Sequence, residues 1–437
     1  MLFWVTLLCA ALALVRLWPG LFVVAINQAG VLRALGNIEQ YGQPWSQSFV
    51  PSGVFSLENL TIARNVFALC TLILAVAVTW PSRAREQIQA ASLPRLPRWV
   101  YVPLGIYVLV VIVSKRTIFS VAYNEPDQVL LEFSLSGGHV FIMSAVLYEV
   151  LCLVRAGSLK PLWAFAGIVA LFVATDYSKG QTGVGGGYLL AAAFACFGAL
   201  DPADRPRRQR MLLLVGAVAT MFVLTLGVRG VRASLAREGA GSVTSFVQPA
   251  NDKEANTART GEGAETFGNS VQYAAHVLEC ISLYEGGLSR EWRSVYLPVV
   301  YTFEPSFLAG PLGFTRPREA AWELMDYYVH GGGIYVPGEL YWNGGYLCVA
   351  LVFAALIAFC RRCDVRYGAS AAWLIMFAWF LPNLLQGIGY GFAQVSRGVF
   401  NGLLALAVWK VGAIVMRGRR RAEPPGVPQP PLPQQAR

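Results

Sequence analysis

Charged side chains are scarce in this sequence, because only 14% of its residues are Asp, Glu, Lys or Arg while 55% are hydrophobic. Soluble domains carry roughly 25% charged residues, and the mean hydropathy here is +0.49. The chain cannot cover itself with a polar surface, which excludes an ordinary soluble domain. We therefore expect an integral membrane protein.

Metal-binding and nucleophile patterns are also missing. The chain has 3 histidines, with no two-histidine zinc motif, no serine nucleophile elbow and no Asp-x-Asp pair of the kind that metal-dependent nucleotide-sugar transferases use. One Cys-x-x-Cys pair, Cys360 and Cys363, cannot by itself complete a tetrahedral zinc site. We therefore expect no metal, no cofactor and a metal-independent mechanism.

Apolar segments of helix length fill most of the chain. A bilayer core needs about 20 apolar residues in a helix, and about ten segments approach that length. They lie at 2–18, 62–80, 99–114, 137–154, 161–175, 183–200, 211–227, 343–360, 369–386 and 396–416. Residues 19–35 are semi-apolar and are expected either to extend the first helix or to re-enter the membrane. The expected fold class is an all-α integral membrane protein.

The distribution of positive charge predicts the topology. The formal net charge is +10, and in a ten-helix arrangement every basic cluster falls on one side, which the positive-inside rule assigns to the cytoplasm. These clusters lie at 83–98, 155–160, 205–210, 361–366 and 417–421. Both termini are then expected in the cytoplasm. The excess charge is a topology signal, and no nucleic-acid partner is expected.

The chain divides into four expected regions. Residues 1–227 hold about seven membrane helices, and residues 343–416 hold about three more. Residues 228–342 between them form a large outer loop that includes short amphipathic helices. Residues 417–437 are rich in Pro and Gln and are expected to be a disordered cytoplasmic tail.

The end of the outer loop carries the most specific pattern. Its residues are His330, Gly331, Gly332, Gly333 and Ile334, then Tyr335, Glu339, Tyr341, Trp342 and Asn343. Three glycines let the backbone approach a ligand closely, and Glu339 and Asn343, four residues apart, share one helical face. The competing interpretation is a plain glycine-rich turn, with Glu339 placed favourably for the helix dipole. These residues alone leave the two interpretations even.

Cations at the outer ends of helices form a second candidate group. Arg229 and Arg232 follow the seventh expected helix, on the side where topology does not require basic residues. Arginine suits bidentate binding of phosphate, although such residues also snorkel to lipid headgroups. Lys179 lies in a short outer turn and Arg397 precedes the last helix, where each could meet the same anion.

The ten-helix plan with one large outer loop resembles the Wzy-type polysaccharide polymerases, which join oligosaccharide repeat units in bacterial inner membranes. Members commonly show a Gly-rich turn and then Glu, Tyr, Asn and glycines as a helix begins. The matching residues here are Gly331, Gly332, Gly333, Glu339, Tyr341, Asn343, Gly344 and Gly345. The turn at Lys179 looks like the family's short outer turn, which often carries Arg instead.

The resemblance implies a GT-C-like membrane glycosyltransferase architecture with a periplasmic loop. It implies a glycan on polyprenyl diphosphate as donor, a lipid-linked repeat unit as acceptor, and a chain-length regulator and a flippase as partners. Arg229, Arg232 and Arg397 would stabilise the leaving diphosphate, and Glu339 or His330 would be the general base. The residues expected to stack on sugars are Tyr335, Tyr341 and Trp342.

Three other functions stay open. An O-antigen ligase, which transfers the glycan to lipid A core, shares topology and donor, and His330 keeps it open because ligases tend to use an outer-loop histidine. A lipid-linked sugar transporter would need charges deep within the spans, whereas here they gather at helix ends. A sugar O-acyltransferase would need a histidine in or near a span, for which only His139 qualifies.

Overall fold

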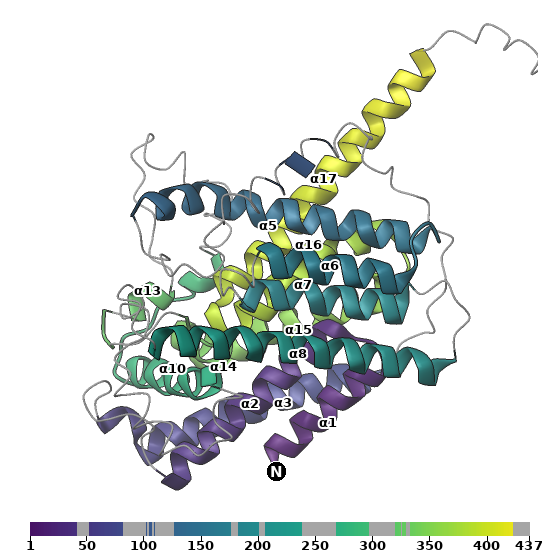
Figure 1. The fold of residues 1–437 in the computed structure, drawn as a ribbon. Helices are drawn as coiled ribbons and strands as arrows, with labels where there is room; N and C mark the ends of the chain where they lie inside the picture. Colours follow the sequence, from purple (N-terminus) through teal and green to yellow (C-terminus); the bar gives the residue numbers. More distant parts are fainter. Residues whose placement is uncertain are drawn as a thin grey trace, which may run out of the picture.

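The computed structural model describes residues 1–41, 52–81, 126–175, 182–200, 206–237, 268–296, 320–324, 326–328 and 333–422, with isolated positions between 102 and 109. Within these ranges every regular element is a helix. The expectation of an all-α protein is therefore confirmed for the described residues. Figure 1 shows most of the helices running alongside one another as a bundle.

The helices fall into two groups along the chain. The first group is α1 (Leu2–Val15), α2 (Pro19–Tyr41), α3 (Leu57–Thr79), α5 (Pro126–Arg155), α6 (Pro161–Thr175), α7 (Thr182–Phe194) and α8 (Arg207–Arg237). The second group is α10 (Gly268–Glu285), α13 (Ala320–Leu324), α14 (Val336–Cys348), α15 (Ala354–Arg366), α16 (Ala371–Tyr390) and α17 (Phe392–Ala422). A π-helical stretch, Val349–Phe353, joins α14 to α15.

Among the described residues, 5 helices are long and apolar enough to cross a membrane. They are Pro19–Gln40, Leu57–Thr79, Arg207–Thr225, Val336–Arg366 and Ala371–Tyr390. Shorter apolar helices at Leu2–Val15, Pro161–Thr175 and Gly185–Gly198 lie among them. The chain is thus a multi-pass membrane protein. The expected segment 99–114 falls almost wholly outside the described residues.

Residues 19–35 differ from the expectation, because they belong to a separate 23-residue helix, α2. The chain turns at Arg16–Trp18 and α2 packs back along α1. Two of its polar residues make hydrogen bonds inside the protein: Asn27 donates to the carbonyl of Val23 at 2.9 Å and Gln28 donates to Thr71 Oγ1 at 2.7 Å. The placement of both termini on one side of the membrane depended on ten crossing helices. Because α2 is an additional helix, that placement no longer follows from the count.

Three further boundaries differ from the expected ones. Helix α14 begins at Val336 instead of 343, because Pro337 is favourable in a first helical turn. Helix α8 continues beyond 227 to Arg237. Helix α17 continues to Ala422, so residues 417–422 of the expected tail are helical, and residues 423–437 lie outside the described ranges.

Basic residues gather at one end of the bundle. Arg207 donates to the carbonyl of Val15 at 3.2 Å, and Arg361 donates to the carbonyls of Trp80 and Pro81 at 3.2 and 3.1 Å. These bonds bring together one end each of α1, α3, α8 and α15, which we call the basic end. The clusters at 205–210 and 361–366 therefore meet there, as the alternation of helices predicts, whereas the cluster at 83–98 is not described.

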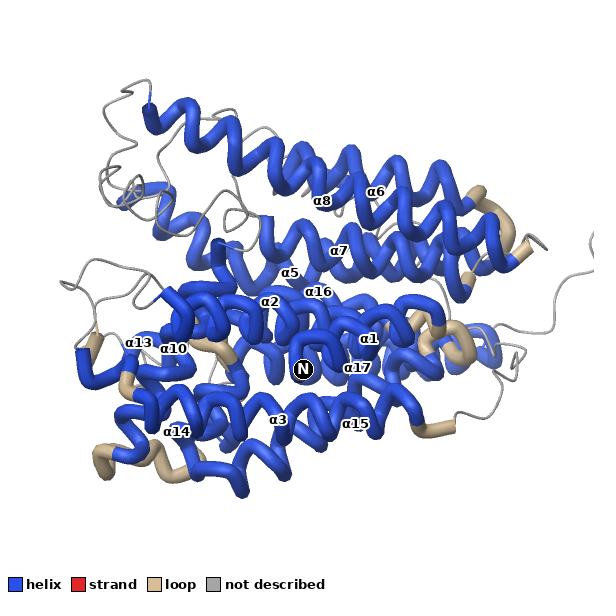
Figure 2. The backbone as a smooth tube through the Cα atoms, turned by 90° about the horizontal axis from the view of Figure 1, so that it is seen from below, coloured by secondary structure: helices blue, strands red, loops and turns tan. Residues whose placement is uncertain are grey.

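The opposite end, which we call the loop end, holds α10, α13 and the start of α14 (Figure 1). Helix α10 packs against α2, α3 and α14, and most of its side chains are buried. It is therefore part of the core, whereas the sequence predicted only a short amphipathic helix within the outer loop. Figure 2 shows the layers: α6 and α8 at one edge, α2 and α16 in the middle, and α3 and α15 at the other edge.

Candidate functional site

The segment after Gly333 forms the start of α14 at the loop end. Tyr335 is extended and precedes the helix, Pro337 lies in its first turn, and Glu339 adds an acidic residue there. Asn343 donates from Nδ2 to the carbonyl of Glu339 at 2.7 Å. This bond confirms that Glu339 and Asn343 share a helical face. Pro337 and Gly338 both belong to this helix.

Glu339 joins this segment to α17. Its Oε2 accepts the backbone N–H of Phe392, the first residue of α17, at 2.6 Å. A carboxylate at a helix N-terminus satisfies an orphan donor and meets the positive end of the helix dipole. Gly391 has a φ of +111°, and a Cβ there would lie 3.1 Å from Glu339 Oε2. The glycine thus permits both the turn between α16 and α17 and the close approach of the carboxylate.

Gly333 packs against the same turn. Its φ is +108°, and a Cβ there would lie 2.9 Å from the carbonyl oxygen of Gly389. The end of the outer loop therefore lies against the turn between α16 and α17, with Glu339 beneath it.

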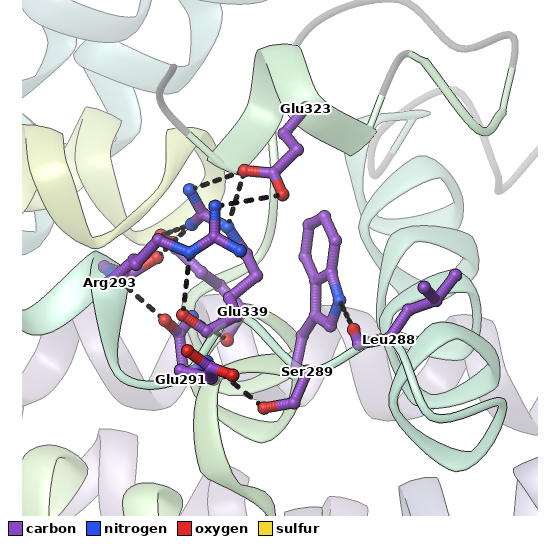
Figure 3. A network of polar contacts seen from close by, with 10 residues as sticks. Leu288, Ser289, Glu291, Arg293, Glu323 and Glu339 are labelled. Atoms are coloured by element: carbon purple, nitrogen blue, oxygen red, sulfur yellow. Dashed lines mark hydrogen bonds and ion pairs between the residues drawn. The ribbon is translucent and has the colours of Figure 1, made fainter. Parts of the chain in front are cut away.

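Arg290 is the centre of a buried ionic network beside Glu339. Its side chain is 1% exposed, its NH2 lies 3.0 Å from Glu323 Oε2, and its NH1 lies 3.9 Å from Glu339 Oε1. It also donates to Ser294 Oγ and lies 5.3 Å over the Trp342 ring. Arg293, whose side chain is 43% exposed, reaches Glu323 from outside at 3.8 Å. Figure 3 shows Arg293 and Glu323 facing each other, with Glu339 below them.

The turn that carries Arg290 is bound to α14 through backbone groups. Helix α14 is kinked at Gly344 and Gly345, whose φ and ψ angles are not helical. The carbonyl of Trp342 accepts the Arg290 N–H at 3.1 Å, and the carbonyl of Asn343 accepts the Trp292 N–H at 3.0 Å. A kink leaves helical carbonyls available to such outside donors.

Two side chains of α14 complete this attachment. Asn343 Oδ1 accepts the N–H of Ser294 at 2.8 Å, and Trp342 Nε1 donates to the carbonyl of Leu288 at 2.6 Å. Asn343 therefore bridges Glu339 and the Arg290 turn. The site is held by α14 and by a turn 49 residues earlier in the chain.

A second buried carboxyl, Glu279 on α10, belongs to the same cluster. It is 1% exposed, and burial raises its pKa to about 8. Burial also raises the pKa of the Cys280 thiol, and the negative charges of Glu279 and Glu339 raise it further. The thiol is thus near both carboxyl groups. A group with a pKa near 8 can exchange a proton at physiological pH.

The three aromatic residues predicted to stack on sugars are buried instead. Tyr335, Tyr341 and Trp342 are 0%, 3% and 1% exposed. Tyr335 stacks on Tyr273 at 5.7 Å between ring centroids, and Tyr341 donates to Glu285 Oε1 at 2.7 Å. This geometry gives them packing roles and does not support a role as a sugar platform.

Other aromatic rings are exposed at the same place. Tyr327 is 47% exposed and lies 6.4 Å from the Trp342 ring. Tyr390 is 46% exposed, and a Cβ on Gly333 would lie 3.6 Å from its Cδ1. Neither was singled out from the sequence, because exposure cannot be read from residue type.

The predicted cations are only partly described. Arg397 lies on α17 and donates to Gln394 Oε1 at 2.9 Å, and Gln394 donates to Gln386 Oε1 at 3.4 Å. Arg397 is thus one to two turns beyond Phe392, at the loop end of the bundle. Arg229 and Arg232 belong to the last turns of α8, but their side chains are not described. The predicted residues that lie outside the described ranges are Lys179, His330, Gly331 and Gly332.

Sequence reasoning missed Arg290, Ser294 and Glu323 as site residues. The available signal was charge in an aromatic segment, at Arg290-Glu291-Trp292-Arg293. Charge at this spacing does not reveal which residue is buried. Among the described residues no group of 3 or more His, Cys, Asp or Glu side chains could hold a metal ion.

These features define a multi-pass, all-α membrane protein with a buried, charged cluster at one end of its bundle. Comparison of the chain with protein-family models, with curated proteins and with solved structures found no match in any of the three.

Proposed function

We propose that this protein is a membrane glycosyltransferase that polymerises polyprenyl-diphosphate-linked oligosaccharide repeat units into a surface or secreted polysaccharide. The observation that carries the proposal is the buried network of Arg290, Glu323 and Glu339 at the loop end. Charged groups are expensive to bury in a membrane protein and commonly mark functional sites. Here they hold the motif that resembles the Wzy-type polymerases against the start of the last helix.

The proposed reaction breaks the bond between the anomeric carbon of the growing glycan and its diphosphate. A hydroxyl oxygen of the incoming lipid-linked unit forms the new bond, and its proton passes to a base. The developing charge on the diphosphate needs cations. We assign Arg229, Arg232, Arg397 and Lys179 to this role, and add the half-exposed Arg293.

The geometry supports a positioning role for Glu339. Its carboxylate is buried and is occupied by Phe392 N–H and by Arg290, so an acceptor hydroxyl has no direct approach in this arrangement. Of the two residues considered from the sequence, we therefore assign the proton transfer to His330.

Sugar contacts are assigned to Tyr327 and Tyr390, because their rings are exposed beside the buried cluster. Aromatic side chains present a large apolar face together with a polar hydroxyl, which suits a sugar ring. The buried Tyr335, Tyr341 and Trp342 would support this surface from below.

The proposed membrane orientation follows from the basic residues at the basic end of the bundle. The positive-inside rule places it in the cytoplasm, which puts the loop end in the periplasm of a bacterial inner membrane. The donor, the acceptor and membrane lipids are then the partners, together with a chain-length regulator and a flippase.

The test uses the purified full-length protein in detergent. Its substrate is the polyprenyl-diphosphate oligosaccharide fraction extracted from cells in which the gene has been deleted. We expect a ladder of repeat-unit multiples on a gel without added nucleotide sugar or metal, and loss of the ladder in Arg229→Ala. Transfer only after lipid A core is added would identify a ligase. Movement of the substrate across liposomes without any product would identify a transporter.

A further inference from the structure

A second charged feature lies at the basic end, away from the proposed catalytic cluster. Arg16 and Arg361 both lie over the ring of Trp18, with their Cζ atoms 4.9 and 5.8 Å from its centroid. Trp18 itself is 4% exposed and fills the turn between α1 and α2. Two like charges are thus held over one fixed aromatic ring.

The arginines at this turn have no acidic partner among the described residues. The salt bridges found in those ranges join Glu39, Glu323 and Glu339 to other arginines. Arg207 and Arg361 donate only to backbone carbonyls here. The Nε of Arg361 is buried without a hydrogen-bond partner. Converging guanidinium groups of this kind are expected to attract an anion.

The turn is rigid, which favours a defined site over a loose charged surface. Both carboxylate oxygens of Asp364 accept backbone N–H groups of α2, from Gly20 at 2.8 Å and from Leu21 at 2.9 Å. Tyr367 donates to the carbonyl of Leu17 at 3.4 Å. Arg16 therefore projects from a turn that α15, the helix that carries Arg361, holds in place.

We propose that Arg16, Arg361 and Arg207 bind the phosphate of an anionic phospholipid headgroup. The setting favours a lipid over a soluble anion, because Trp80, whose carbonyl Arg361 contacts, is 60% exposed at the end of a candidate span. Tryptophan at a helix end is typical of the headgroup region. The lipid would link the ends of α1, α8 and α15 and so stabilise the bundle. This inference is independent of the proposed glycosyl transfer.

The test measures thermal unfolding of the delipidated full-length protein in detergent. Phosphatidylglycerol is titrated in mixed micelles, with phosphatidylcholine and inorganic phosphate in parallel. We expect phosphatidylglycerol alone to raise the Tm, with a half-saturating concentration about fivefold higher in Arg16→Gln, because one cation near an anionic surface contributes on the order of 1 kcal/mol. The Arg16 side chain is exposed and, among the described residues, contacts only the Trp18 ring, so the variant is expected to fold.

Arg208→Gln is the matched control, since it removes one positive charge at the same end and makes no described contact. Its half-saturating concentration should equal that of the unchanged protein. If the half-saturating concentration rises equally in both variants, the lipid is attracted by overall positive charge, and the proposal of a defined site is wrong. An equal Tm rise with phosphatidylcholine, or with inorganic phosphate alone, would overturn the assignment to an anionic lipid.

Discussion

The carboxylate of Glu339 accepts the backbone N–H of Phe392 at 2.6 Å, across 53 residues of sequence. This bond joins the first turn of α14 to the first turn of α17. It also places Glu339 Oε1 3.9 Å from the NH1 of Arg290. One carboxylate therefore links the loop motif, the last helix and the buried arginine.

Substitution of Glu339 distinguishes a positioning role from a role as the general base. Glu339→Gln keeps an oxygen that can accept the Phe392 N–H, so we expect a small change in Tm, a weakened ladder of products and an unchanged pH profile. Glu339→Ala leaves the donor without an acceptor and should lower stability by about 1–3 kcal/mol. The measurements are thermal unfolding and product length on gels. Complete loss of activity in Glu339→Gln at unchanged Tm would instead identify Glu339 as the base.

Substitution of Gly391 tests the close approach of the Glu339 carboxylate to the turn between α16 and α17. Gly391→Ala would place a methyl group 2.9 Å from Ile334 Cγ2 and 3.1 Å from Glu339 Oε2, at a φ of +111°. Strain of this kind costs on the order of 1–3 kcal/mol, and we expect a lower Tm. Gly36→Ala is the control, because nothing lies within 4 Å of a Cβ there and alanine favours a helix. Equal Tm values in the two variants would contradict this account of the turn.

Arg290 and Arg293 should behave differently although both contact Glu323. Arg290→Met leaves Glu323 and Glu339 without a buried cation, which typically costs about 3–5 kcal/mol. Arg293→Gln removes a half-exposed charge, worth about 1 kcal/mol or less, yet it should weaken polymerisation if Arg293 meets the diphosphate. Unfolding temperature and polymer length are measured for both.

A third variant tests whether the stability lost in Arg290→Met is caused by the missing charge. Arg290→Met combined with Glu323→Gln should recover part of the stability, because it removes one of the two carboxylates that lose their contact with Arg290. If the double variant is as unstable as the sum of its parts, packing around Trp342 is the cause instead.

Long apolar helices were the most predictable part of the fold. Residues 161–175 form α6 with the expected bounds, because hydropathy alone decides a continuous apolar run. Residues 19–41 were less clear, since Asn27, Gln28 and Arg33 lower the hydropathy of the segment. Gln28 is fully buried and bonded to Thr71 of α3, a contact that hydropathy cannot detect.

Within the candidate site, only the contact inside helix α14 could be predicted from the sequence. The four-residue spacing gives the bond between Asn343 and Glu339, because helical geometry determines it. The partners of Glu339 and Asn343 in space, Phe392 and Ser294, are 53 and 49 residues away. One sequence contains no signal for such contacts. For the same reason, the burial of Tyr335, Tyr341 and Trp342 could not be distinguished from exposure.

The hairpin of α1 and α2 predicts where the N-terminus lies. Arg16 is at the basic end, and 14 helical residues separate it from Met1, which corresponds to about 21 Å along a helix. If α1 and α2 both cross, the N-terminus lies on the side opposite the basic end. A reporter that is active only in the periplasm should then be active at the N-terminus and inactive at the C-terminus. An inactive N-terminal reporter would mean that α1 does not cross.

Glu279 should make stability depend on pH. Burial raises its pKa from 4.5 to about 8, so the folded protein binds this proton more tightly than the unfolded chain does between those values. Stability is then highest near the acidic limit of this window and falls as pH rises to about 8, by roughly 1.4 kcal/mol per pH unit at most. Glu279→Gln keeps a neutral side chain of similar shape and should remove this slope.

The measurement is thermal unfolding between about pH 5 and about pH 9, with Glu58→Gln as the control because that carboxyl is exposed at the start of α3. The control should keep the slope of the unchanged protein. Activity adds a second readout, since Cys280 lies near both Glu279 and Glu339 and a new charge on Glu279 would reach the Arg290 network. We therefore expect the ladder to shorten above about pH 8 in the unchanged protein and much less in Glu279→Gln. An identical pH slope in all three proteins would mean that Glu279 does not change its charge in this range.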